Sequence, residues 1–344
     1  ITFDNWNATL GEYSLNVCTQ LETDENPFND CKLKDVDVYP GTWINGSAFP
    51  IGTYLGSGVG YVSSIESNTG YLFSIGGNTT SGLNKECFKY NINTNTWSQI
   101  SSLPQGRRVL ATTVVDDFIY AIGGSDIQSL YQSTVYKYDI VENTWTTVAP
   151  LPSSLGWCKA VTYKNKIYLA GGVQNGPVAE ATVYVYDVAT DIWTTATSMP
   201  AARFGGAFSI AENKLVYIGG AELTLLHNTV FVGIIDTLNP AVIQWNTMAN
   251  PYPGINEESY SEYAGSVIDL FANFNAEVTN QQNEMPYPPG TMYRFDAAPW
   301  GTDGIIVAGG SPTPDWIPAN PNPCFVYKPD TDTWITQEDV PIPV

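Results

Sequence analysis

Short apolar runs alternate with turn residues along most of the chain, and these runs recur at a nearly constant spacing. A pair of glycines follows such a run five times, at residues 76–77, 123–124, 171–172, 219–220 and 309–310, and the first four pairs are 47, 48 and 48 residues apart. The runs, such as Phe118–Ile122 and Ile167–Ala170, are rich in branched and aromatic residues and too short for helices. The pattern therefore predicts buried inner strands that recur once in each structural unit.

Each glycine pair is followed by a second strand signal and then by a tryptophan. Segments such as Val135–Asp139 and Val183–Asp187 alternate as half-buried strands do. The tryptophans stand at positions 97, 145, 193, 245 and 334, and a proline lies seven residues beyond four of them, at 104, 152, 200 and 341. Because proline cannot donate to a sheet ladder, it marks the end of an outer strand. Each unit is predicted to be one antiparallel sheet.

The order Gly-Gly, Tyr-Asp, Trp and Met/Leu-Pro, with arginine at Arg107 and Arg203, resembles the kelch repeat over most of residues 51–344. The resemblance implies an all-β fold, a kelch-type β-propeller in which glycine lets inner strands approach closely and tryptophan fills the wider gap between blades. We predict a single β-propeller domain over residues 1–344 with about six four-stranded blades, and seven as the alternative.

Residues 1–50 depart from the repeat. Trp43 and Pro50 reproduce the spacing of seven residues, but no glycine pair precedes them. We predict a degenerate N-terminal blade here, braced by a disulfide between Cys18 and Cys31. A disulfide indicates a secreted protein, and the alternative is two free thiols in a cytosolic one. The chain begins at Ile1, as it would after removal of a leader or inside a longer chain.

The second departure lies between Trp245 and Trp334, which are 89 residues apart. The interval predicts an insertion between blades at residues 251–290, and a degenerate seventh blade using residues 267–274 is the competing interpretation. Aromatic side chains on a long connection favour contact with a partner, and the alternative is that the insertion only covers one face of the propeller. The candidate interface residues are Tyr252, Tyr260, Tyr263, Phe271, Phe274 and Tyr287.

The net charge and the lack of a long apolar run argue against two kinds of partner, nucleic acids and membranes. The chain has 34 acidic and 14 basic residues, a net charge of −20, so it repels phosphate backbones and anionic lipids. We therefore expect no nucleic-acid partner. No run approaches the roughly eighteen apolar residues of a membrane span, so no membrane insertion is expected either.

The residues that carry catalysis are scarce. The copper radical oxidases related to kelch propellers need two histidine ligands, and His227 is the single histidine here. A sialidase-type site needs a cluster of arginines that binds a carboxylate. The chain has four arginines, and two of them occupy positions where the repeat itself often places an arginine; the four are Arg107, Arg108, Arg203 and Arg294. We predict that the protein is not an enzyme and that it binds no cofactor or metal. The alternative is a propeller hydrolase that uses a pair of carboxylates.

The sequence favours a secreted, non-enzymatic propeller that acts as an extracellular binding, adhesion or structural-assembly glycoprotein. Its partner would be another protein or a second copy of itself, and its candidate N-glycosylation sites are Asn7, Asn45 and Asn78. Carbohydrate binding is a second hypothesis, with Trp157, Trp300 and Trp316 stacking on sugar faces. An intracellular kelch adaptor is a further alternative.

Overall fold

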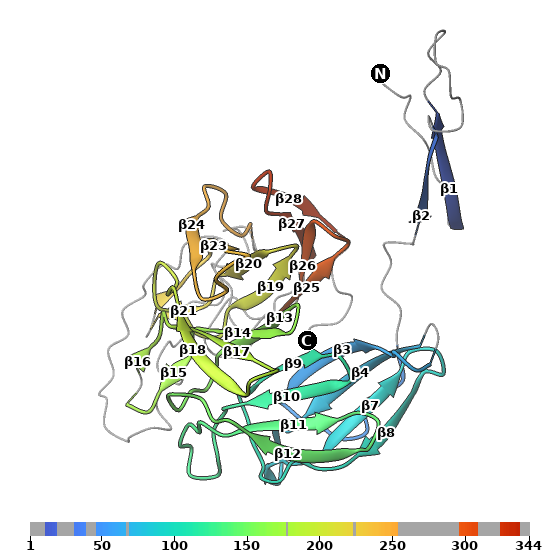
Figure 1. Ribbon diagram of the computed structural model, residues 1–344. Helices are drawn as coiled ribbons and strands as arrows, with labels where there is room; N and C mark the ends of the chain where they lie inside the picture. Colours follow the sequence, from blue (N-terminus) through green and yellow to red (C-terminus); the bar gives the residue numbers. More distant parts are fainter. Residues whose placement is uncertain are drawn as a thin grey trace, which may run out of the picture. The chain divides into compact units, whose positions relative to one another are not determined.

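A computed structural model describes most of the repeat region and a short N-terminal hairpin (Figure 1). The described residues are 11–18, 31–38, 46–66, 69–176, 178–222, 225–253, 296–308 and 324–337. Contacts divide the chain into two units, Ile1–Ile44 and Asn45–Val344, which we describe separately.

The second unit contains five four-stranded antiparallel sheets, each made of strands in chain order. Blade 1 comprises β3 (Ser57–Val62), β4 (Gly70–Ile75), β7 (Cys87–Asn91) and β8 (Thr96–Ile100). Blade 2 comprises β9 (Ala111–Val115), β10 (Phe118–Ile122), β11 (Val135–Asp139) and β12 (Thr144–Val148). Blade 3 comprises β13 (Lys159–Tyr163), β14 (Lys166–Ala170), β17 (Val183–Asp187) and β18 (Ile192–Ala196). Blade 4 comprises β19 (Ala207–Ala211), β20 (Lys214–Ile218), β23 (Val230–Ile235) and β24 (Ile243–Thr247), and blade 5 comprises β25 (Asp296–Trp300), β26 (Gly304–Ala308), β27 (Cys324–Lys328) and β28 (Thr333–Thr336).

Small two-stranded ladders decorate three of these blades. They are β5 (Asn78–Thr79) with β6 (Gly82–Leu83), β15 (Val173–Gln174) with β16 (Val178–Ala179), and β21 (Ala221–Glu222) with β22 (Leu225–Leu226). Each lies in the connection between the second and third strands of its blade. No helix occurs among the described residues.

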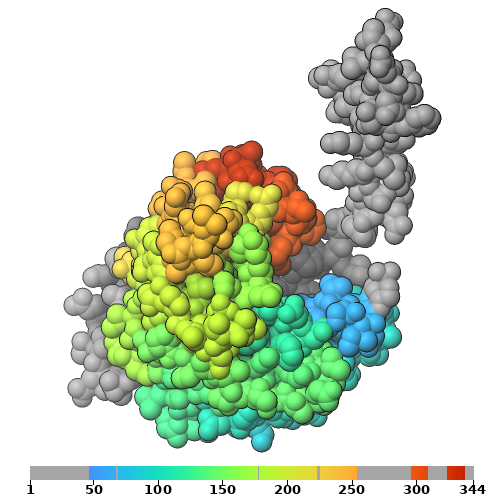
Figure 2. Space-filling view, viewed as in Figure 1, coloured from blue at the N-terminus to red at the C-terminus, as the bar shows by residue number. Residues whose placement is uncertain are grey.

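The first strands of successive blades are neighbours in space, since β3 contacts β9, β9 contacts β13, β13 contacts β19 and β19 contacts β25. In Figure 2 the blades follow one another in the order of the colour bar, from blue to red. The predicted inner strands before the glycine pairs are the second strands of the blades, one position further from the axis. They are buried as predicted, and Ile122 and Leu169 are fully inaccessible to solvent.

The glycine pairs of blades 1 to 3 follow the second strand of a blade and pack against the connection that leads into the next blade. Both members of the pairs in blades 1 to 4 have positive φ. A Cβ on Gly171 would lie 2.3 Å from the carbonyl oxygen of Arg203, and the N–H of Gly172 donates to that same oxygen at 2.9 Å. Because Arg203 lies in the connection that leads into the following blade, only glycine allows the two backbones to come this close.

A tryptophan clamp repeats at every junction that the structure describes. The indole N–H of each outer-strand tryptophan donates to a backbone carbonyl, which in blades 2 to 5 lies just after the outer strand of the preceding blade. The pairs are Trp97 with Ser47, Trp145 with Ser101, Trp193 with Ala149, Trp245 with Thr197 and Trp334 with Asn250, at 2.8–3.3 Å. A tyrosine of the third strand packs on each of four of these indoles, as Tyr186 does on Trp193 at 4.8 Å between ring centroids.

The clamp on Trp97 bears on the number of blades. Ser47 stands four residues after Trp43, as Ser101 does after Trp97, so residues 46–50 occupy the place of an outer strand's exit. The described part of residues 1–44 is one hairpin, β1 (Gly11–Cys18) with β2 (Cys31–Val38), and the described chain contains five four-stranded blades. The predicted count of six or seven blades is therefore not confirmed, and the degenerate N-terminal blade stays a prediction.

Candidate functional site: the loop face of the propeller

Because the four strands of a blade are antiparallel, the connections between them lie at two opposite ends of the blade. The connections between second and third strands, and those between one blade and the next, lie at one end, which we call the loop face. The turns between first and second strands and between third and fourth strands lie at the other, which we call the turn face. On the loop face the two kinds of connection pair with each other through isolated bridges, as Arg108 does with Ser125 and Phe204 with Ala221.

A row of equivalent residues crosses the loop face just before the first strands of blades 1 to 4. Leu55, Val109, Trp157 and Gly205 all have left-handed backbones, with φ between 51° and 65°. The N–H of Val109 donates to Leu55 O at 2.8 Å, that of Trp157 to Val109 O at 2.8 Å, and that of Gly205 to Trp157 O at 3.2 Å. A left-handed β-branched residue such as Val109 is strained by about 1–3 kcal/mol. The backbone hydrogen bonds of the row hold Leu55, Val109 and Trp157 in this conformation.

These side chains belong to one apolar cluster that joins blades 1 to 4. Its buried members are Val109, Tyr131, Val173, Phe204, Ala221 and Leu226, and Leu55, Trp157 and Ala179 cover it while half-exposed. The ring of Tyr131 lies against Gly156, where a Cβ would approach it to 2.4 Å. The loop face therefore has a rigid apolar centre from which the Trp157 ring is partly accessible.

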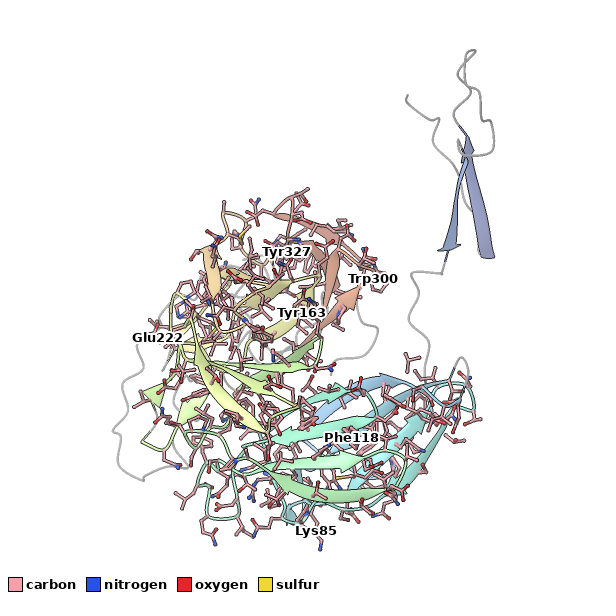
Figure 3. All side chains as sticks on the ribbon, in the orientation of Figure 1. Lys85, Phe118, Tyr163, Glu222, Trp300 and Tyr327 are labelled. Atoms are coloured by element: carbon pink, nitrogen blue, oxygen red, sulfur yellow. The ribbon has the colours of Figure 1, made fainter. Side chains whose placement is uncertain are left out.

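Charge is distributed unequally between the two faces of the described part of the propeller. The turn face has twelve carboxylates and four lysines; these are Glu66, Asp116, Asp117, Asp139, Glu142, Asp187, Asp191, Glu212, Asp236, Asp303, Asp330 and Asp332, with Lys164, Lys166, Lys214 and Lys328. The loop face has five of each sign; these are Glu86, Asp126, Glu180, Glu222 and Asp296, with Lys85, Arg107, Arg108, Lys159 and Arg203. Figure 3 marks Lys85 and Glu222. All three described arginines therefore lie on the loop face.

The buried Arg203 is the centre of a polar cluster on blade 4, and the Glu222 side chain of this cluster is 45% exposed. Its Nη1 lies 3.3 Å from Glu222 Oε2, and its Nη1 also donates to the Ala202 carbonyl at 2.7 Å. His227 Nε2 lies 3.9 Å from the same Glu222 oxygen. Burial lowers the pKa of His227, and the neighbouring Arg203 charge lowers it further against the opposing effect of Glu222. The imidazole is therefore neutral at pH 7, and Glu222 neutralises Arg203.

Arg107 and Arg108 have no such counter-charge among the described residues. Arg107 is buried, and its guanidinium donates to Gly106 O and to Gln105 Oε1, both at 3.0 Å. Arg108 is half-exposed, and donates from Nε to Ser125 Oγ at 3.0 Å and from Nη2 to Ser129 Oγ at 2.6 Å. The kelch resemblance predicted the structural position of Arg107, but nothing in the sequence pattern distinguished Arg108.

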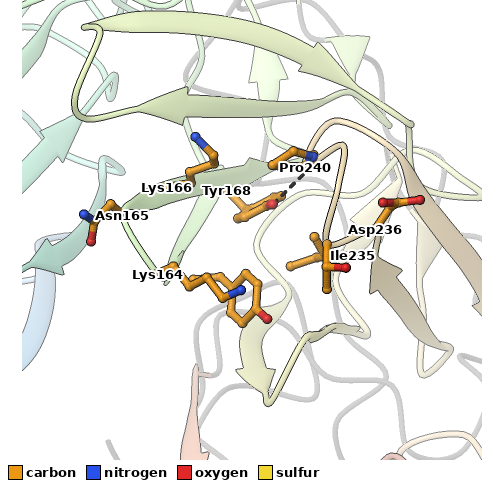
Figure 4. A pocket seen from close by; sticks show the side chains of 9 residues that line it. Lys164, Asn165, Lys166, Tyr168, Ile235, Asp236 and Pro240 are labelled. Carbon is orange, nitrogen blue, oxygen red and sulfur yellow. Dashed lines mark hydrogen bonds between the residues drawn. The ribbon is translucent and has the colours of Figure 1, made fainter.

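The turn face contains a cavity of about 320 Å³ between blades 3 and 4 (Figure 4). It is lined by Tyr163, Lys164, Asn165, Lys166, Tyr168, Ile235, Asp236, Thr237 and Pro240. Most of its polar groups already have partners within the protein. Lys166 pairs with Asp187 at 2.6 Å, Asp236 accepts from two backbone amides, and the Tyr168 hydroxyl donates to Pro240 O at 3.1 Å. The cavity is a crevice between blades whose groups serve the fold.

The predicted interface residues fall largely outside the described residues. Tyr260, Tyr263, Phe271, Phe274 and Tyr287 all do so, as does most of the predicted 251–290 insertion. Tyr252 is described and is 1% exposed, packed against Phe325 and Trp334 of blade 5. Its assignment to an interface is wrong, because it fills the core between blades 4 and 5.

The other predicted site residues have different outcomes. Trp157 is part of the left-handed row, Trp300 is exposed on β25, and Trp316 lies outside the described residues. Among the sequons, Asn7 and Asn45 also lie outside them. Asn78 is 6% exposed and pairs with Tyr54 through its backbone, which argues against a glycan on it in the folded domain.

Cys18 and Cys31 face each other as the last pair of the β1–β2 ladder. Opposite residues of an antiparallel ladder have Cα atoms about 4.5 or 5.5 Å apart, and both values lie within the range that a disulfide spans. The register is therefore compatible with the predicted bond. Cys87, Cys158 and Cys324 are buried, and burial raises the pKa of Cys87 and of Cys158 to about 12.

Neither a metal-binding cluster nor a membrane-spanning helix is found among the described residues. No group of three or more His, Cys, Asp or Glu side chains is placed to hold a metal ion in the described part of the chain. The same residues include no helix long and apolar enough to cross a bilayer.

The repeated four-stranded sheets, glycine pairs and tryptophan clamps define a kelch-type β-propeller. The family model of the Attractin/LZTR1 β-propeller matches residues 60–269, more than half of the chain. The chain therefore belongs to this family, whose propeller domains mediate protein–protein interaction. No curated protein sequence matches the chain closely enough to serve as a relative.

Proposed function

We propose that this propeller is a secreted, non-enzymatic module that binds another protein through its loop face. The inequality between the two faces is the observation on which the proposal rests. The loop face combines a rigid, half-exposed apolar centre with charges of both signs, whereas the turn face is dominated by carboxylates. Protein interfaces favour an apolar, aromatic centre with arginine and few unpaired carboxylates.

Two exposed residues of blade 2 allow the proposal to be tested with a matched control. Ile127 projects from the loop face with 74% exposure and Val141 from the turn face with 54%. Ile127→Asp and Val141→Asp each replace one exposed aliphatic side chain by a carboxylate, so their effects on solubility and total charge are equal. Both should fold as the parent does, as judged by thermal unfolding.

The measurement is binding of the purified domain to an array of extracellular proteins. We expect Ile127→Asp to abolish the strongest signal and Val141→Asp to retain it. Loss of binding in Val141→Asp alone would transfer the function to the turn face. An array of glycans run in parallel would reveal the carbohydrate alternative by a signal that depends on Trp157 or Trp300.

The secreted location is supported by the opposed cysteines of the N-terminal hairpin. Its test is a count of thiols under denaturing, non-reducing conditions, with intact mass before and after glycosidase treatment. We expect three free thiols and a glycan on Asn7 or Asn45. Five free thiols and the bare polypeptide mass would instead favour the intracellular kelch adaptor.

A further inference from the structure

Arg108 is a half-exposed cation of the loop face without a carboxylate partner among the described residues. Its Nε and Nη2 are held by serine hydroxyls, which are neutral and do not offset its charge. No carboxylate of the described residues lies within 4.0 Å of it, and no described group bonds Nη1. Arg203 on the same face has Glu222 as its counter-charge. Arg108 therefore presents a positive charge in a molecule whose net charge is −20.

The loop that holds Arg108 is rigid before any ligand arrives. Ser125 is 2% exposed, and Ser129 has a left-handed backbone with φ 62°. Asp126 Oδ1 accepts the backbone N–H groups of Gln128 and Leu130, at 2.9 and 3.0 Å, which fixes the loop between the two serines. A guanidinium held in this way loses little conformational entropy when it pairs with a carboxylate.

Aromatic and aliphatic groups lie on the same face as this guanidinium. Tyr131 and Trp157 pack in the same apolar cluster, and the charge of Arg108 lowers the pKa of Tyr131 against the larger, raising effect of burial. Trp157 is half-exposed at the centre of the face, and Ile127 and Leu130 project from the tip of the same loop. The loop face therefore offers a ligand exposed apolar side chains as well as the charge of Arg108.

We propose that the Arg108 site binds an acidic peptide segment of the partner protein, in which an Asp or Glu carboxylate is flanked by apolar side chains. Arg108 donates to the carboxylate through Nη1, and Trp157, Ile127 and Leu130 contact the flanking residues. The twelve carboxylates of the turn face repel such a segment, and the balanced loop face does not. This inference rests on the proposed function, because it names the partner chemistry of that same face.

The test uses fluorescence polarisation with a labelled short peptide in which glutamates alternate with leucine and tyrosine, and with its glutamine counterpart. The wild-type protein should bind the glutamate peptide at least about tenfold more tightly than the glutamine peptide, since a charged hydrogen bond is worth roughly that factor. Arg108→Gln should remove this preference. Lys164→Gln is the matched control, because it removes a lysine of the turn face that no described carboxylate pairs with.

Ser129→Ala provides a second variant in case Arg108→Gln does not fold. It removes one hydroxyl that orients the guanidinium, so the preference for glutamate should fall several-fold with the fold intact. Equal binding of the two peptides by wild type, or an equal loss in Lys164→Gln, would overturn the inference. If Ile127→Asp still abolished binding of the protein partner in that case, the loop face would remain the interface and only the acidic partner would be wrong.

Discussion

The loop face and the turn face are built from opposite ends of the same strands, yet they are constructed differently. On the loop face, backbones approach closely at the glycine pairs, and left-handed residues are held in a hydrogen-bonded row. On the turn face, side-chain carboxylates cap tight turns, as Asp139 does for Val141 and Glu142. The loop face has five charges of each sign on a closely packed backbone, whereas the capped turns leave an excess of carboxylates in solvent. The difference explains how a strongly acidic chain keeps one face free of excess negative charge.

Among the variants that test this difference, Gly171→Ala should cause the largest loss in the free energy of unfolding. The new Cβ would lie 2.3 Å from Arg203 O, so the two blades must separate, and we expect a loss of about 3 kcal/mol or more in the free energy of unfolding. Gly176→Ala is the control, because it also has positive φ but no atom within 4 Å of a new Cβ. Its loss should be about 1 kcal/mol. Urea unfolding measures both, and equal losses would mean that φ alone matters.

Trp193→Ala should be next in size. It removes a half-buried indole together with the hydrogen bond to Ala149 O, and we expect a loss of about 2–4 kcal/mol. Trp300→Ala removes an indole that is 46% exposed and should cost less than about 1 kcal/mol. Thermal unfolding of the two variants compares them. A small loss for Trp193→Ala would show that the clamp does not hold adjacent blades together.

Breaking an ion pair should cost more unfolding free energy on the loop face than on the turn face. Glu222→Gln leaves the buried Arg203 without its counter-charge, and we expect a loss of about 1–3 kcal/mol. Lys166→Gln breaks the pair with Asp187 on the turn face, where both side chains are partly exposed, and should cost at most about 1 kcal/mol. Urea unfolding at low and high salt checks this, with salt sensitivity expected for the turn-face pair.

The smallest expected effect is a dependence of stability on mildly acidic pH. His227 has a pKa below its usual value in the folded state, so the unfolded chain binds its proton more readily. Stability due to this group is complete above the ordinary histidine pKa of about 6.5 and falls as the pH drops towards the folded value. His227→Gln should flatten the stability curve below about pH 6.5. If the stability of His227→Gln depended on pH as steeply as that of the wild type, carboxylates rather than His227 would cause the dependence.

The regular blades were predictable because their signals are local. Each glycine pair, strand and tryptophan lies within one repeat, and a period of about 48 residues repeats the same solution of backbone sterics and packing. Tyr252 was assigned wrongly for the opposite reason. It follows the last regular outer strand in sequence, but its burial depends on Phe325 and Trp334, which lie more than 70 residues away.

The sequence by itself determined the kelch-type propeller, the positions of its strands and the contacts between neighbouring blades, because these follow from periodic residues with one steric role each. Only the tertiary structure decided that Val109 and Trp157 share a left-handed row and that Arg108 lacks a carboxylate while Arg203 has one. Both properties depend on which loops meet at one end of the blades. Such meetings join residues from different repeats, and no pattern within a repeat encodes them.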